Sequence, residues 1–168
     1  ATTHLQGKYA RLVDSCGTIS NTTTTGDVDF SLGSGTDCAV PTGNTGGPGN
    51  THSARTQYYH LTSANLRAQA WLPGNTWLQN SYITVYTNQS PWCNATSGGD
   101  SLNFYKAASG CWNLGEIPGV AIHEWGHSLD NFDGSGNQST PVETYADWMA
   151  GLHLHDSCVG RGFFLSGN

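Results

Sequence analysis

Apolar side chains recur every three or four residues in three stretches of the chain, which is the spacing of one buried face of an α-helix. The first stretch covers 51–72 and ends at the turn Pro73-Gly74-Asn75. The second covers about 117–129, where Pro118 suits the first helical turn. The third covers about 141–153. We therefore predict three helices, and the second and third follow each other closely in the sequence.

Four further stretches favour β-strands because they alternate polar and apolar residues or are rich in β-branched and aromatic side chains. They lie at 4–13, 22–30, 82–87 and 101–106. The stretch at 4–13 is long enough for one strand or for two short ones. The chain of 168 residues supports a single domain with a substantial core.

The second predicted helix contains the motif His123-Glu124-Trp125-Gly126-His127, which reads H-E-x-x-H. Residues four apart lie on the same face of a helix, so the two imidazoles can bind one Zn²⁺. Glu124 follows the first histidine, which places its carboxylate beside the metal without making it a ligand. A general base for a zinc-bound water is needed at this position. The alternative is a chance match or two histidines within a core, which we consider the weaker interpretation for a motif of this specificity.

A catalytic zinc site also needs a third protein ligand and an open position for water. Glu143 and Asp147 lie four residues apart on the third predicted helix, so both carboxylates face the same way. One can bind the metal while the other accepts the N–H of a ligating imidazole. Asp133 is the alternative third ligand, at the position where metzincins place a histidine or aspartate. Asp130 stands where metzincins have a glycine, so we favour Glu143.

The H-E-x-x-H motif, followed by Glu143-Thr144-Tyr145-Ala146-Asp147, resembles the HExxH…ExxxD pattern of gluzincins, the thermolysin-like and fungalysin-like secreted metallopeptidases. The resemblance implies Glu143 as the third zinc ligand and Asp147 as the residue that orients His123. It also implies that the pair Asn94-Ala95, on the strand that edges the cleft, contacts the substrate backbone.

The same resemblance implies a zincin-like α+β fold. In that fold a mixed, twisted sheet packs on a long helix and on the HExxH helix, and a helix that carries the glutamate ligand follows. We expect residues 1–168 to form one such catalytic domain, with strands and loops in 1–50 and with the long helix, edge strands and zinc-site helices in 51–168.

One part of the family pattern is missing. Gluzincins have a further helical lobe that supplies a histidine to stabilise the oxyanion, whereas only about 20 residues follow Asp147 here. We expect either that this C-terminal lobe was removed by cleavage or that the site is minimal. His153 and His155 lie at the end of the glutamate helix, and we expect them to have a structural role.

Composition narrows the range of partners. The chain has six Lys and Arg against twelve Asp and Glu, so it lacks the basic patch that nucleic acid would require. No apolar run approaches the roughly 20 residues of a membrane span. The first residues include neither Met nor a basic and apolar leader, so we expect a mature chain whose export signal has been removed.

The five cysteines include no C-x-x-C pair, which argues against a thiolate zinc site. Their order suggests disulfides Cys16–Cys38 and Cys93–Cys111, although sequence alone does not determine the pairing. Disulfides imply an oxidising compartment, and hence a secreted, extracellular protein. Cys158 is then left over, which predicts a bond to another chain or to a downstream segment.

These observations together predict a secreted zinc metalloendopeptidase that acts on proteins or peptides, with Glu124 as general base. The alternative is a non-catalytic secreted zinc-binding fragment with a structural or assembly role. Asp130, Asp133 and Asn137 surround a turn and form a candidate Ca²⁺ site, although their spacing is not that of an EF-hand.

Overall fold

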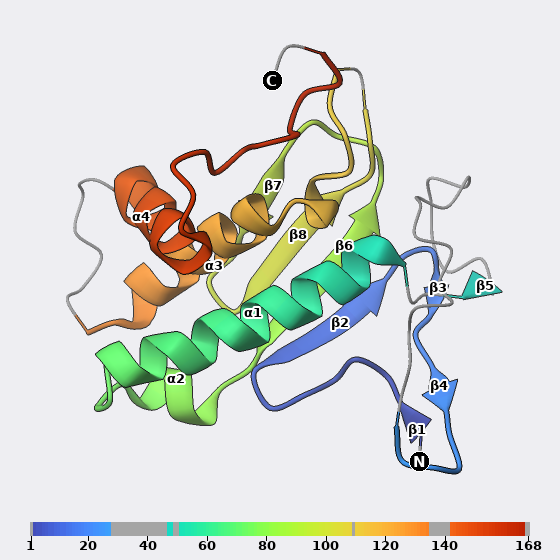
Figure 1. Ribbon diagram of the computed structural model, residues 1–168, viewed down its shortest axis with the longest axis horizontal. Helices are drawn as coiled ribbons and strands as arrows, with labels where there is room; N and C mark the ends of the chain where they lie inside the picture. The colour runs from blue at the N-terminus through green and yellow to red at the C-terminus, as the bar shows by residue number, and fades with distance from the viewer. Residues whose placement is uncertain (1, 28–46, 49–50, 109, 135–141, 167–168) are drawn as a thin grey trace.

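A four-stranded mixed sheet lies at the centre of the computed structural model, which describes residues 2–27, 47–48, 51–108, 110–134 and 142–166. The strands follow the order β2-β6-β8-β7 across the sheet, so β7 is at one edge (Figure 1). The first three are parallel and β7 runs antiparallel to β8. Their bounds are β2 Ala10–Asp14, β6 Ile83–Gln89, β7 Ala95–Ser97 and β8 Ser101–Tyr105.

Two helices, α1 (His52–Trp71) and α3 (Pro118–Phe132), contact each other as well as the sheet, so they cover the same face of it. The helix α4 (Val142–Leu154) packs against α3 (Figure 1), and its last turn contacts α1 through His153. No helix in the described ranges combines the length and apolar character needed to cross a membrane. The remaining elements are short: β1 Thr2–Thr3, β3 Gly17–Thr18, β4 Asn21–Thr22, β5 Gly47–Pro48, α2 Thr76–Asn80 and the 3₁₀ helix η1 Leu114–Glu116.

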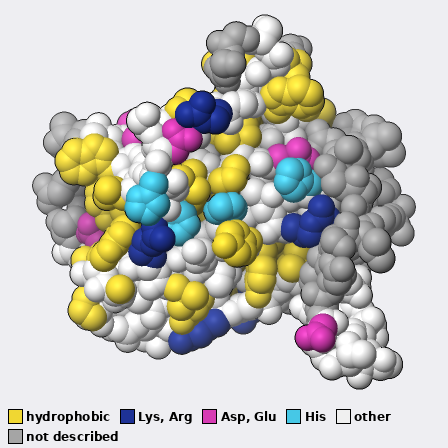
Figure 2. Space-filling view, viewed as in Figure 1, with side chains coloured by type: hydrophobic (Ala, Val, Ile, Leu, Met, Phe, Trp, Pro, Cys, Tyr) yellow, Lys and Arg dark blue, Asp and Glu magenta, His cyan; other side chains and the backbone are white. Residues whose placement is uncertain are grey.

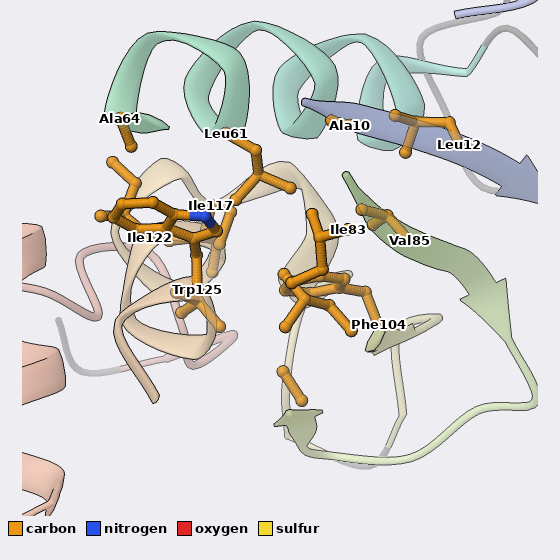
Figure 3. Packing of buried hydrophobic residues seen from close by; sticks show 14 of the residues in the cluster. Ala10, Leu12, Leu61, Ala64, Ile83, Val85, Phe104, Ile117, Ile122 and Trp125 are labelled. Atoms are coloured by element: carbon orange, nitrogen blue, oxygen red, sulfur yellow. The ribbon is translucent and has the colours of Figure 1, made fainter. Parts of the chain in front are cut away.

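The hydrophobic core fills the space between the sheet and the two helices (Figure 3). Leu61 of α1 and Trp125 of α3 meet Phe104 from β8 there, and each is 1% exposed or less. Burial alternates along β2, where Leu12 is buried and Val13 is exposed. This alternation is expected of a sheet that is covered on one face only.

A buried polar network fixes the start of α1 at the carboxyl ends of β2 and β6. Thr51 is the N-cap residue, because its hydroxyl accepts a hydrogen bond from the Ala54 amide. The same hydroxyl donates to Asp14 at 2.7 Å, and Asn88 donates its amide to Asp14 at 2.8 Å. Burial raises the pKa of Asp14, and the hydrogen bonds from Asn88, Cys16 and Thr51 oppose this shift.

The α+β class and the three helices predicted from periodicity are confirmed, whereas the predictions of strands near the amino end are partly wrong. The stretch 4–13 contains only β2, because Leu5 adopts a positive φ of 51° that interrupts an extended strand. In the stretch 22–30, only Thr22 lies in a strand, residues 23–27 are not a strand, and 28–30 lie outside the described residues. Thr23 and Thr25 bond to each other locally, and such short side-chain contacts compete with strand pairing.

The predicted disulfide Cys93–Cys111 is present, with a Cα–Cα distance of 5.6 Å, and it joins the segments that flank the β7–β8 pair. Cys16 is also disulfide-bonded, while Cys38, its expected partner, lies outside the described residues. Cys158 is a free, exposed thiol. A partner for it remains a prediction.

Histidine side chains gather beside a basic side chain on the face over α1 and α4 (Figure 2). The rings of His60 and His153 lie edge to face at 6.3 Å, and His153 is only 9% exposed. Arg67 donates to the carbonyl of His153 at 2.9 Å, which satisfies an acceptor at the end of α4. Burial, followed by the charges of Arg67, His60 and His155, lowers the pKa of His153 to about 4.

This lowered pKa predicts that acid weakens the fold. In the unfolded chain His153 binds a proton near pH 6.5, whereas in the folded chain it does so only near pH 4. The free energy of unfolding is therefore highest above pH 6.5 and decreases as the pH falls from 6.5 to 4. The difference corresponds to on the order of 3 kcal/mol. We expect His153→Gln to flatten the pH dependence of the free energy of unfolding in urea. An unchanged slope in His153→Gln would exclude this origin.

Candidate metal centre

The helix α3 places His123 and His127 one turn apart on the face that meets α4, as the spacing of the motif predicts. Their Nε2 atoms are 3.1 Å apart. Both rings are mostly buried, with side-chain exposures of 17% and 15%. The two nitrogens therefore converge on one point at the helix surface.

The helix α4 brings a carboxylate to the same point. Oε2 of Glu143 lies 3.2 Å from Nε2 of His123, and Oε1 lies 3.6 Å from Nε2 of His127. One ligand atom from each of the three residues can be chosen so that all lie within 4.8 Å of one another. In the part of the chain that the structure describes, this is the one such group of His, Cys, Asp and Glu side chains.

These separations fit the dimensions of a small divalent cation. Metal–nitrogen and metal–oxygen bonds of about 2.0–2.1 Å in a tetrahedral site put neighbouring ligand atoms about 3.3 Å apart. The distances of 3.1, 3.2 and 3.6 Å are close to this value. Glu143 is 79% exposed, so the site opens toward solvent on the side of this carboxylate.

Asp147 lies one turn after Glu143 and contacts the other nitrogen of the first histidine. Its Oδ1 is 2.8 Å from Nδ1 of His123. A carboxylate there accepts the N–H of Nδ1, which leaves the lone pair of Nε2 directed at the three-residue group. This geometry is the one expected of a residue that orients a metal-binding imidazole.

Gly126 allows the two helices to approach closely enough for these contacts. A Cβ atom on Gly126 would lie 2.8 Å from Cα of Ala146 and 3.3 Å from its Cβ. Real Cβ atoms do not come so close to a backbone atom, so any side chain at 126 would push α4 away. Ala146 lies between Glu143 and Asp147 in the sequence, as Gly126 lies between the two histidines.

Glu124 faces the same cleft but is buried, with 7% exposure. Burial raises the pKa of its carboxyl group to about 7, against the opposing effect of His123 and with a smaller upward effect of Glu143. Burial also lowers the pKa of His127, and His123 adds to that shift. A neutral imidazole is the form that binds metal.

The cleft holds about 490 Å³ and has the edge strand β7 as one wall and α3 and α4 as the other. Asn94 and Ala95, which were predicted to contact substrate, border it together with the three-residue group. Four further residues line the cleft that no sequence motif predicted: Thr96, Ser97, Asn131 and Val142. A signal for Asn131 was available, because it lies four residues after His127 on the same helical face.

Asp133, the alternative third ligand, is not among the three grouped residues and forms the C-cap of α3. Burial raises the pKa of Tyr145 to about 12, and the charges of Asp133 and Asp130 add to this shift. Asn137, the third member of the candidate Ca²⁺ site, lies outside the described residues. That Ca²⁺ site therefore remains a prediction.

Comparison with solved structures finds a similar fold in the "Precursor of Protealysin, Metalloproteinase from Serratia proteamaculans", with a TM-score of 0.55 and 12% sequence identity. The match covers 73% of this chain and 41% of that one, so this chain spans about two-fifths of the length of its neighbour. No protein-family model and no curated protein matches the chain. The likeness is one of fold, and it agrees with the predicted zincin-like architecture.

The close approach at Gly126 can be tested by Gly126→Ala. A methyl group there must displace α4, which we expect to cost about 1–3 kcal/mol of folding stability, partly offset by the roughly 1 kcal/mol better helix propensity of alanine. Zinc affinity, measured by competition with a chromogenic chelator, should fall because Glu143 moves with α4. Gly74→Ala is the control, since a Cβ at Gly74 meets nothing within 4 Å. Zinc affinity equal to wild type in Gly126→Ala would contradict the argument.

The contact between Asp147 and His123 gives a second test. Asp147→Ala should weaken zinc binding about 10- to 100-fold, as is typical when the carboxylate behind a metal-binding histidine is removed. Isothermal titration of the metal-free protein with Zn²⁺ measures this change. Asp100→Ala removes the same charge from the turn between β7 and β8 and should bind zinc as wild type does. Equal affinities in the two variants would rule out the orienting role.

Proposed function

We propose that this protein is a secreted zinc-dependent metalloendopeptidase. The observation that carries the proposal is the group of His123, His127 and Glu143, with Asp147 behind the first histidine and the buried Glu124 in the same cleft. Two imidazoles and one carboxylate are a donor set of catalytic zinc sites. The fold similarity to a metalloproteinase precursor supports the same assignment.

The chain's own residues supply the groups that peptide hydrolysis needs. A bound Zn²⁺ would lower the pKa of a water toward 7 and polarise the peptide carbonyl. The Glu124 carboxylate takes the proton of the attacking water and passes it to the leaving amine. Burial raises the pKa of Glu124, to about 7 in the metal-free chain, so its carboxylate is a stronger base than that of an exposed glutamate. Asp147 holds the His123 ring in the orientation that the ligand set requires.

The edge strand provides a place for the substrate. In the described part of the sheet, β7 pairs with β8 on one side only, and its other side borders the cleft. An extended peptide can add to such an edge through backbone hydrogen bonds. Asn94, just before β7, borders the cleft, and its amide is proposed to bond the substrate backbone in addition.

Secretion is part of the proposal, and the disulfide Cys93–Cys111 supports it, because disulfides persist in oxidising compartments. The substrates are proteins or peptides. We include a chain or segment bonded through the exposed thiol of Cys158 as a proposed partner. Ca²⁺ at Asp130, Asp133 and Asn137 is a further proposal.

One observation favours a second candidate function, a non-catalytic zinc-binding fragment. Apart from the two histidines of the group, none of the described residues that line the cleft is a His, Tyr, Lys or Arg that could stabilise an oxyanion. The remaining donors there are amides and hydroxyls, such as those of Asn94 and Asn131. A zinc-binding fragment does not need Glu124, so this residue distinguishes the two functions.

Glu124→Gln is the deciding variant. It should retain zinc, measured by atomic absorption, and lower the hydrolysis of casein by about 10²- to 10⁴-fold, because it removes the general base. A chelator should abolish the wild-type activity, and added Zn²⁺ should restore it. Glu116→Gln makes the same change at a glutamate that lies beside His52 and away from the cleft, and it should keep full activity. If the wild type binds zinc but cleaves no peptide, the zinc-binding fragment is the correct function.

A further inference from the structure

Four asparagines in the chain have the sequence Asn-x-Ser/Thr with no proline between, which is the acceptor motif for N-linked glycosylation. They are Asn21, Asn88, Asn94 and Asn137. A glycan fits on the folded protein only where the asparagine side-chain amide is accessible. The burial of each asparagine therefore shows which of these motifs can carry a glycan. Asn137 lies outside the described residues and is left aside.

Asn88 cannot carry a glycan in the folded protein. Its side chain is 0% exposed, and its Nδ2 donates to Asp14 at 2.8 Å and to Thr51 at 2.9 Å. A sugar on Nδ2 would remove these bonds and would have to fit within the buried network that fixes the start of α1. Any chain modified at Asn88 would therefore fail to reach this fold.

Asn94 meets the requirements of an acceptor. It is exposed and lies in the non-regular segment immediately before β7. No hydrogen bond joins its side chain to any other described residue, so nothing in that part of the protein competes for its Nδ2. Thr96, which completes the motif, is partly exposed on β7.

The position of Asn94 gives its modification a consequence for the site. Asn94 borders the same cleft as His123 and Glu124, and that cleft holds about 490 Å³. A branched oligosaccharide on Nδ2 would extend from the rim of this cleft, next to the start of β7. It would also replace one N–H of the amide that is proposed to bond the substrate.

We propose that Asn94 is an N-glycosylation site and that its glycan closes the cleft to substrate. The modification rests on the proposed secretion, and its effect rests on the proposed peptidase function. In the reaction, Nδ2 forms a bond to C1 of the first N-acetylglucosamine of a lipid-pyrophosphate-linked oligosaccharide. The C1–O bond breaks, the lipid pyrophosphate leaves with its electron pair, and Nδ2 loses one proton.

The experiment compares the full chain made in a eukaryotic secretory host with the same chain made in the bacterial periplasm, where disulfides form without this N-linked modification. Peptide mapping by mass spectrometry, before and after enzymatic removal of N-glycans, reports whether Asn94 is modified. Activity on casein is then measured per zinc bound, and the ratio between the two preparations is taken for each variant. Because each variant is compared with itself, an intrinsic effect of a substitution cancels.

Thr96→Ser keeps the motif, and Thr96→Ala removes it. We expect a glycan at Asn94 in the wild type and in Thr96→Ser, with activity in the secreted preparation roughly tenfold lower, because only the unmodified fraction keeps an open cleft. Thr96→Ala should have equal activity in both preparations. Thr23→Ala removes the motif at Asn21 on β4, beyond the opposite edge of the sheet from β7 (Figure 1), and should leave the wild-type ratio unchanged.

An unmodified Asn94 in the secreted wild type would show that Asn94 is not a glycosylation site. A modified Asn94 with equal activity in both preparations would show that the glycan does not close the cleft. Absence of peptidase activity from both preparations would refute the proposed function, while the peptide map would still decide the modification. A glycan on Asn88 in folded, secreted protein would contradict the inference that a buried asparagine cannot carry one.

Discussion

The candidate site depends on the close contact between α3 and α4 at Gly126. The backbones of the two helices can meet there because position 126 has no side chain, and Ala146 opposite it has only a methyl group. The ligand distances follow from this approach, since Glu143 and Asp147 flank Ala146 and reach His123 at 3.2 and 2.8 Å. A carboxylate side chain is short, so a wider separation of the helices would break both contacts at once.

The cleft places two carboxylates in different environments, which gives them different chemistry. Glu143 is 79% exposed, so its carboxylate can reach the metal position from the solvent side of the cleft. Glu124 is 7% exposed, and burial raises its pKa to about 7, so it can exchange a proton near neutral pH. The difference arises from position: Glu124 projects from the middle of a packed helix, whereas Glu143 lies in the first turn of α4.

Local patterns predicted much of this arrangement. The periodicity of α1, α3 and α4 predicted each helix to within a few residues, since each has one continuous apolar face. The two motifs, each with residues four apart, placed His123, His127 and Glu143 on helix faces that the structure brings together. In both cases the relevant information lies within one or two helical turns.

The rest depends on contacts between distant residues, which local patterns do not encode. A glycine within a helix suggests local weakness, and only the position of Ala146 shows that Gly126 permits a helix contact. The contact between His60 and His153 joins residues 93 positions apart in the sequence, and no local motif around either residue predicts it. The threonine run after Thr22 has strand propensity, but it has few apolar side chains to bury, and its hydroxyls bond locally.

The free edge of β7 connects the proposed catalysis with the proposed modification. Three constraints hold this short strand in place: its pairing with β8, the nearby disulfide Cys93–Cys111, and the bond of 2.9 Å between the Ser97 and Ser128 hydroxyls. The last of these joins β7 to α3 one residue after His127, so the strand and the metal ligands share one rigid frame. A strand fixed on one side and open on the other leaves Asn94 without a protein partner among the described residues. An amide in that position is available to a peptide backbone and to a glycan donor alike, and the two uses compete because a glycan on Asn94 would occupy the rim of the cleft that the peptide must enter.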